Sequence, residues 1–193
     1  MDTPRKEDFR LSAIEIPKNG GLVVKWKYSK SVRDEIHEVE DSIKTTVEPH
    51  PDLKSKVRSL KDYYLEITHL GFLKKVMERD QFKADESQKK LMESGVEELK
   101  RLIRISKLSF SGSEDNFGLI ITGEVEAWTG QKMAFNTHRV KTEDEIYGFE
   151  NELADLIEEI RLECYEFIYN GKMAEPDLFQ NSVENLNQEE DGE

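Results

Sequence analysis

The side chains best suited to bind a metal or attack a substrate are four histidines and one cysteine. The histidines are His37, His50, His69 and His138, and no two stand four residues apart, the spacing that puts two ligands on one helix face. Cys164 falls on the apolar stripe of a predicted helix, where a thiol is a small core residue. The sequence therefore predicts no metal site, no cofactor and no catalytic residue, and we expect a protein that is not an enzyme.

One stretch superficially resembles the PD…ExK nuclease motif. Pro51, Asp52 and Glu66 match its first positions. Thr68 stands where the motif has lysine, and all four residues fall on a predicted helix instead of a bent pair of strands. We therefore reject a nuclease site.

Acidic residues crowd the last predicted helix. Asp155 and Glu159, or Glu159 and Glu163, stand four apart and could share a divalent ion. The helix has no opposing histidine, and its acids lie opposite its apolar stripe, so we interpret them as a solvated face. The alternative is an acidic face that meets a basic partner or imitates nucleic acid. The residues of this face are Glu152, Asp155, Glu159 and Glu163.

Basic residues of the first half form a second candidate surface, for nucleic acid. They belong to a predicted strand and to the first long helix: Lys25, Trp26, Lys27, Lys54, Lys56, Arg58 and Lys61. The cations could contact phosphates while Trp26 stacks on a base. Acidic residues flank the helical cluster, so the sequence favours a solvated helix face, with Trp26 packed against the sheet.

The distribution of charge divides the chain. The formal net charge of the 193 residues is −13. Residues 1–83 carry 17 basic against 15 acidic residues, and residues 84–193 carry 11 against 26. The first half could approach a phosphate backbone, whereas the second would repel it. No apolar run is long enough to span a membrane, and a single cysteine suits a reducing compartment, so we expect a cytoplasmic protein.

Residues 174–193 have the composition of a disordered acidic tail. Within it, the stretch Glu175–Phe179, EPDLF, resembles the bacterial sliding-clamp-binding peptide, which ends in Leu-Phe after Ser or Asp. The resemblance implies a protein partner, the clamp of a bacterial host, contacted by Glu175 and Asp177 and anchored by Leu178 and Phe179. Glu175 stands where the family has Gln, and Pro176 stands where Leu is usual. The alternative is that Leu178 and Phe179 fold back onto the last helix.

Alternation and turn residues predict the supporting elements. A hairpin is expected over 10–29, with Asn-Gly at its turn. Residues 29–42 fit a short helix as well as a loop, and a brief strand is expected over 43–47. An amphipathic helix is expected from Asp52 to Gly71, and a three-stranded meander over 102–140. The last helix is expected to start at a capping box formed by Thr142 and Glu145.

The chain also contains a candidate internal repeat. Arg10-Leu11-Ser12 aligns with Arg104-Ile105-Ser106, and Gly21–Val24 aligns with Gly118–Ile121. The alternative is a chance match of ordinary hairpin-plus-helix units. The predicted fold class is α+β, one domain over 1–173, with repeated units at about 8–71 and 102–172, a helical linker at 72–101, and the tail at 174–193. We expect an antiparallel sheet of five or six strands with helices packed on one face.

Three functional hypotheses follow. The leading one is a non-enzymatic adaptor that docks a partner through the tail and acts in or against DNA replication. The combination of a small acidic α+β domain with the DLF tail resembles uncharacterised small proteins of tailed phages and prophages, which implies a phage or mobile-element origin. The alternatives are an acidic inhibitor that imitates nucleic acid and a protein that binds single-stranded nucleic acid.

Overall fold

The computed structural model describes residues 3–18, 20–33, 35–68, 86–112, 117–126, 129–141 and 146–174. The strands are β1 (Arg10–Glu15), β2 (Leu22–Val32), β3 (Glu35–Thr45), β4 (Arg104–Ser111), β5 (Gly118–Glu126), β6 (Lys132–Asn136) and β7 (Val140–Lys141). The helices are the short 3-10 turn η1 (Lys6–Asp8), α1 (Pro51–Ile67), α3 (Glu86–Leu102) and α4 (Glu150–Tyr169).

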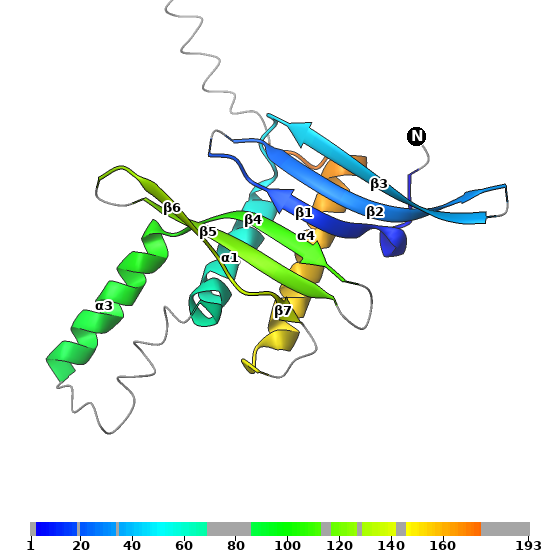
Figure 1. Ribbon diagram of the computed structural model, residues 1–193. Coiled ribbons are helices and arrows are strands. Elements are labelled where there is room, and N and C mark those ends of the chain that lie inside the picture. Colours follow the sequence, from blue (N-terminus) through cyan, green and yellow to red (C-terminus); the bar gives the residue numbers. More distant parts are fainter. Residues whose placement is uncertain are drawn as a thin grey trace, which may run out of the picture.

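The described strands form one antiparallel sheet in the order β3-β2-β1-β4-β5-β6, and β7 pairs with β5. Helices α1 and α4 cover one face of this sheet, and α3 lies near its β6 side (Figure 1). The predicted α+β class and antiparallel sheet are confirmed. Helix α3 runs through Gly95 without a break, although glycine at this position predicts an interrupted or softened helix, and none of the described helices is long and apolar enough to cross a membrane.

Strand β3 corrects the sequence prediction for residues 29–42, which was a short helix or a loop, and its last residues, 43–45, belong to the brief strand predicted over 43–47. Its eleven residues pair without interruption with β2, from Leu22 opposite Thr45 to Val32 opposite Glu35. The long neighbouring strand β2 provides hydrogen-bond partners for the backbone of this polar segment. The side chains of β3 are mostly exposed and supply little of the core. Lys27 of β2 and Glu38 of β3 form an ion pair across the two strands, at 2.7 Å. Charged residues on an outer strand also discourage pairing with other chains.

The start of α4 is another correction. The helix begins at Glu150, not at the predicted capping box, whose residues Thr142 and Glu145 lie outside the described part of the chain. Gly148, with φ of 76°, makes the turn immediately before the helix. The Glu150 carboxylate then accepts a hydrogen bond from the Tyr147 amide at 2.5 Å, and this bond lowers the pKa of Glu150.

The sheet centre joins the two halves of the chain through matching positions. In the β1–β4 pairing, Ile14 faces Leu108, while Ala13 faces Ser109 and Glu15 faces Lys107. A two-fold axis passing between Ile14 and Leu108 would produce this register. The β1–β2 ladder shifts between Leu11 and Ala13, and the β4–β5 ladder shifts between Ile105 and Lys107, at positions that the sequence alignment equates. Descent of the halves from one repeated sequence stays a prediction.

The two long helices bury the same positions. Leu53, Val57, Leu60, Tyr64, Leu65 and Ile67 of α1 correspond to Leu153, Ile157, Ile160, Cys164, Tyr165 and Phe167 of α4, and all are buried. Each helix lies over strands of the other half of the chain. Tyr64 of α1 reaches Gly123 of β5, and Tyr169 of α4 contacts Trp26 of β2, with ring centroids 6.2 Å apart.

At matching positions, one half of the chain has its large side chain on the strand and the other half has it on the helix. Trp26 on β2 corresponds to Gly123 on β5, and Cys164 on α4 corresponds to Tyr64 on α1. A Cβ atom on Gly123 would lie 2.5 Å from the Tyr64 ring. Gly123 is therefore required by the close approach of Tyr64, whose hydroxyl donates to the Phe135 carbonyl at 3.1 Å.

Replacing Gly123 with alanine should lower the free energy of unfolding by about 1–3 kcal/mol, because the new methyl group overpacks against the Tyr64 ring. The control is Gly95→Ala in α3, where a Cβ meets nothing within 4 Å and should stabilise the helix by about 1 kcal/mol. Urea denaturation measures both. The cost of Gly123→Ala should shrink in a Tyr64→Leu background, and an equal cost in both backgrounds would contradict this packing.

Candidate anion-binding groove

A basic groove lies where α1, the β1–β2 loop and the α3–β4 junction meet. It encloses about 390 Å³. Among the described residues, one carboxylate, that of Glu48, lines it together with six cations: Lys18, Lys54, Arg58, Lys61, Arg101 and Arg104. The groove therefore concentrates positive charge on a protein whose net charge is −13.

Local structure explains why these cations converge. Lys54, Arg58 and Lys61 step by four and three residues along α1, beside its buried stripe. The ring Nδ1 of His50 accepts from the Asp52 amide at 3.2 Å, and this cap fixes where α1 begins. On the opposite wall, Gly21 has φ of 82°, and a Cβ there would lie 2.3 Å from the Thr45 carbonyl oxygen. Only glycine lets the β1–β2 loop approach the end of β3 this closely.

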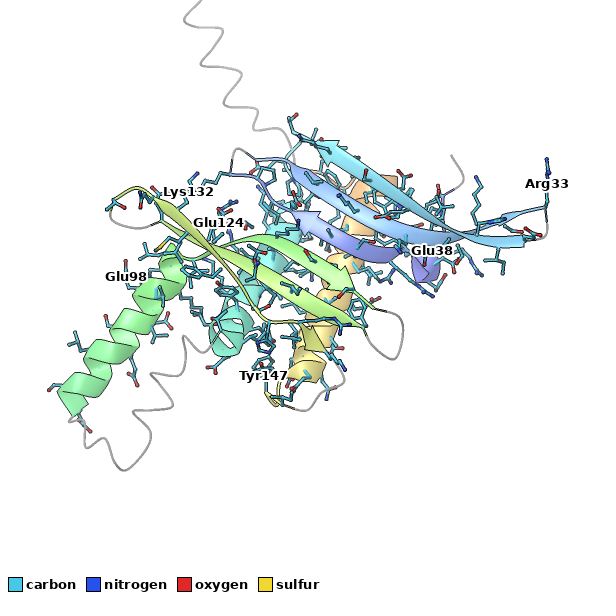
Figure 2. The ribbon with its side chains drawn as sticks, viewed as in Figure 1. Arg33, Glu38, Glu98, Glu124, Lys132 and Tyr147 are labelled. Carbon is cyan, nitrogen blue, oxygen red and sulfur yellow. The ribbon has the colours of Figure 1, made fainter. Side chains whose placement is uncertain are left out.

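Four of the six cations have carboxylate partners. The pairs are Lys18–Glu126 at 2.8 Å, Arg101–Glu98 at 3.3 Å, Arg104–Glu124 at 2.6 Å, and Lys54–Glu48. Glu98 projects from α3 and Glu124 from β5 (Figure 2). These carboxylates neutralise four of the six positive charges that line the groove.

Arg58 and Lys61 are different. In the described part of the chain no carboxylate pairs with either side chain. The Lys61 ammonium donates to the backbone carbonyl of Lys100 at 3.1 Å. Burial lowers the pKa of Lys61, and the nearby charges of Arg58 and Lys100 lower it further. Within the described ranges these two cations therefore lie together without a balancing carboxylate, so a bound anion would relieve their repulsion.

A second groove at the opposite end of β1 and β4 provides an internal comparison, and we call it the charge-balanced groove. It encloses about 610 Å³ and is lined partly by α4. There Glu158 and Arg161 occupy the helix positions that Arg58 and Lys61 occupy on α1. Arg161 pairs with Glu158 at 2.6 Å and lowers its pKa, and it also donates to the Phe9 carbonyl at 2.9 Å. The matching helix positions therefore carry an ion pair on α4 and two cations on α1.

The other predicted nucleic-acid residues do not join the groove. Trp26 is 3% exposed and packs against Phe9, so the stacking role is wrong, because its ring is inside the core. Lys25 and Lys27 alternate with Trp26 on β2 and therefore point away from the helices. Lys56 pairs with Glu159 of α4 at 2.7 Å. Of the seven candidates, the structure gathers Lys54, Arg58 and Lys61.

The predicted acidic face is divided. Glu152, Asp155 and Glu159 are exposed and line a shallow hollow between α4 and α1 that also holds Asp62. Glu163 is partly buried and belongs to a different cluster, at the start of α1.

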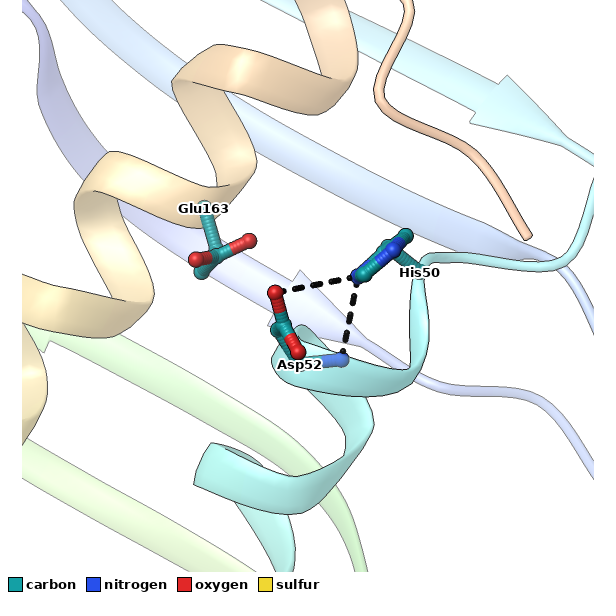
Figure 3. Close-up of side chains that lie close together, drawn as sticks. All are labelled: His50, Asp52 and Glu163. Atoms are coloured by element: carbon teal, nitrogen blue, oxygen red, sulfur yellow. Dashed lines mark hydrogen bonds and ion pairs between the residues drawn. The ribbon is translucent and has the colours of Figure 1, made fainter. Parts of the chain in front are cut away.

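That cluster, which we call the ionic clasp, consists of His50, Asp52, Glu163 and Lys172 (Figure 3 shows the first three). The ligand atoms of His50, Asp52 and Glu163 lie within 4.8 Å of one another, a spacing that could suit a metal. The Lys172 ammonium already bridges the two carboxylates, at 2.8 Å from Asp52 and 2.8 Å from Glu163. The clasp therefore ties the start of α1 to the end of α4. Sequence reasoning missed it, because its residues come from three separate segments.

The predicted partner-binding residues Glu175, Asp177, Leu178 and Phe179 lie outside the described residues. The chain that leads to them is placed. Met173 forms a bridge with Pro49, and the Ala174 amide donates to the Glu48 carbonyl at 3.2 Å. The tail therefore starts beside Glu48, which lines the basic groove.

Comparison with protein-family models, curated proteins and solved structures finds no match to this chain. The chemistry of this chain is therefore inferred from the geometry of its own residues.

Removing the clasp cation should destabilise the fold in a pH-dependent way. Lys172 is the main cause of the lowered pKa of Asp52, and a lowered carboxyl pKa stabilises the fold above its ordinary value of 3.8. That stabilisation is lost as the pH falls through the lower, folded pKa. We expect Lys172→Met to lower the melting temperature at pH 7, and the difference from the wild type to shrink under acid conditions. Lys90→Met, at an exposed position of α3, is the control and should change little.

The Cys164 thiol should be unreactive in the folded protein. It is fully buried, and burial raises its pKa, so neither access nor thiolate is available to a disulfide reagent. Titration with DTNB should detect no thiol under native conditions and one in guanidinium. Rapid labelling of the native protein would contradict the core assignment.

Proposed function

We propose that this chain is a non-enzymatic binding protein whose basic groove holds the phosphate groups of a single nucleic-acid strand. The observation that carries the proposal is the pair Arg58 and Lys61, adjacent on α1 and without a carboxylate partner in the described part of the chain. In the charge-balanced groove the equivalent pair, Glu158 and Arg161, neutralises itself. The cationic pair is therefore a property of this site and not of the fold.

The dimensions suit a short piece of one strand. Lys54 and Lys61 are seven residues apart on α1, about 10 Å along the helix axis. For a strand that keeps the duplex-like stacking of about 3.4 Å per nucleotide, this length corresponds to roughly three phosphates. The guanidinium of Arg58 can hold a phosphate oxygen pair, and the two lysines act as point charges.

The surroundings favour a single strand over a duplex. Glu48, Glu98, Glu124 and Glu126 pair with cations at the rim, and the whole chain carries a charge of −13. A duplex would bring twice the density of phosphates against these acids. With Trp26 buried, no base-stacking role remains for it, so we expect binding that depends on phosphates and is indifferent to base sequence.

The adaptor function predicted from the tail is a second proposal. A partner such as a sliding clamp would be docked by Leu178 and Phe179, and placement in phage DNA replication follows from that resemblance. The placed course of Met173 and Ala174 supports it, because it brings the start of the tail to the surface of the domain beside Glu48. The acidic-mimic alternative would use the exposed acids of α4.

Binding of a fluorescently labelled dT12 oligonucleotide tests the groove. In about 50 mM salt, the double variant Arg58→Gln and Lys61→Gln should weaken binding about tenfold or more, because both free cations are lost. It should also make the slope of log affinity against log salt shallower by about 1.4, at roughly 0.7 for each single-strand phosphate contact. Anisotropy titration measures both quantities.

The matched control removes the same charge elsewhere. Lys25 and Lys90 are exposed on β2 and α3, so Lys25→Gln with Lys90→Gln should bind within about twofold of the wild type. If the wild type does not bind at low salt, or if the two double variants bind equally, the groove is not a nucleic-acid site.

A further inference from the structure

We infer that the acidic tail, residues 175–193, docks in the basic groove of its own chain, where its first carboxylates contact the cations of α1. The tail contact uses the groove of the proposed function and rests on that assignment of the groove as an anion site. Its occupant is different, a peptide carboxylate of this chain in place of a phosphate. Three observations on the described residues support it.

The first observation is where the tail begins. Gly171, with φ of 68°, turns the chain after α4, and the ionic clasp then holds Lys172 against Asp52. Met173 pairs with Pro49, and Ala174 is hydrogen-bonded to Glu48. Glu48 and Pro49 both line the basic groove. Consecutive contacts thus deliver the tail to the mouth of the groove.

The second observation is reach. From Pro51 at the start of α1, Lys61 lies ten residues on, about 15 Å along the helix. Ala174 lies beside Glu48, three residues before Pro51, and the Met173–Pro49 bridge is antiparallel, so the tail must turn back to follow α1. An extended chain covers about 3.3 Å per residue, so the nineteen residues 175–193 are long enough to turn and to reach Lys61. The first acids of the tail, Glu175 and Asp177, would then meet the cations of α1.

The third observation is chemical complementarity. The tail carries seven acidic residues and no lysine or arginine. Arg58 and Lys61 lack a carboxylate partner among the described residues, and burial beside other cations has lowered the pKa of Lys61. A peptide tethered at the mouth of the groove has an effective concentration in the millimolar range, so individually weak ion pairs suffice.

The apolar residues of the tail also find counterparts. The Lys61 ammonium bonds to the Lys100 carbonyl, which places the end of α3 beside this part of the groove. Leu102, two residues further on, is 52% exposed and lines the groove with the partly exposed Ile16. On the proposed path, in which the tail turns back along α1, Leu178 and Phe179 would reach this end of the groove. Docking there would cover apolar surface that is otherwise in water.

Zero-length cross-linking of the full chain with a carbodiimide is the direct test. At low salt we expect amide bonds from Glu175 or Asp177 to Lys54 or Lys61, identified by mass spectrometry of the digest. The exposed Lys25 and Lys90 are internal controls and should be linked to the tail at least about tenfold less often. Absence of tail cross-links, or equal linkage to Lys25 and Lys90, overturns the inference.

An equimolar mixture of isotope-labelled and unlabelled protein identifies the chain that supplies the tail. Links confined to peptides of one isotope support docking within a chain. Links equally shared between light and heavy peptides overturn it and assign the groove to the tail of a second copy.

The oligonucleotide assay separates this inference from the proposed function. A full-length variant with all seven tail acids converted to amides (E175Q, D177N, E184Q, E189Q, E190Q, D191N and E193Q) should bind dT12 about tenfold more tightly at low salt. The gain should vanish when Arg58 and Lys61 are also replaced with glutamine. Cross-links without oligonucleotide binding would sink the nucleic-acid function and leave the tail contact standing. If the oligonucleotide binds equally with and without the tail acids and no cross-links form, the tail contact is wrong and the nucleic-acid function stands.

Discussion

The antiparallel pairing of β1 with β4 is the interaction on which the rest of the structure depends. It joins two strands about ninety residues apart in the chain, and Ile14 faces Leu108 at its centre. The other described strands extend outward from this pair, β2 and β3 on one side and β5, β6 and β7 on the other. The pairing also decides which helix covers which strands, because α1 and α4 each lie over the half of the sheet formed by the other half of the chain. Neither half could bury its apolar face without this contact.

Two grooves at corresponding places result from this frame, and the side chains at matching helix positions give them different charge. Where α4 carries Glu158 and Arg161, the groove neutralises itself. Where α1 carries Arg58 and Lys61, no described carboxylate pairs with either side chain, and the pKa of Lys61 is lowered by burial and then by the neighbouring charges of Arg58 and Lys100. Two neighbouring cations without a described carboxylate partner favour binding of a ligand of opposite charge. The ionic clasp and the Ala174–Glu48 hydrogen bond place the start of the acidic tail beside this groove, so the charges of the tail and of the groove can interact.

Much of the fold could be predicted from local pattern. Alternation identified the β1–β2 hairpin, four-three spacing identified α1, and the alignment of Leu11 with Ile105 anticipated positions that later coincide with matching bulges. The failures were of two kinds. Strand β3 is held by its ladder with β2, since its polar residues have no strong strand pattern of their own. The start of α4 depends on a turn at Gly148 and on a Glu150 carboxylate that bonds to the Tyr147 amide, which no periodicity reveals.

By itself, the sequence determined the α+β class, the apolar stripes of the helices, the core position of Cys164 and the charge asymmetry between the halves. These follow from residue type and short-range spacing, which act within a few turns of chain. The tertiary structure alone decided which charges meet. It buried Trp26, paired Lys56 with Glu159, and left Arg58 beside Lys61. Electrostatic and packing partners depend on distances between segments far apart in sequence. Those segments come together only when the sheet forms around the β1–β4 pair.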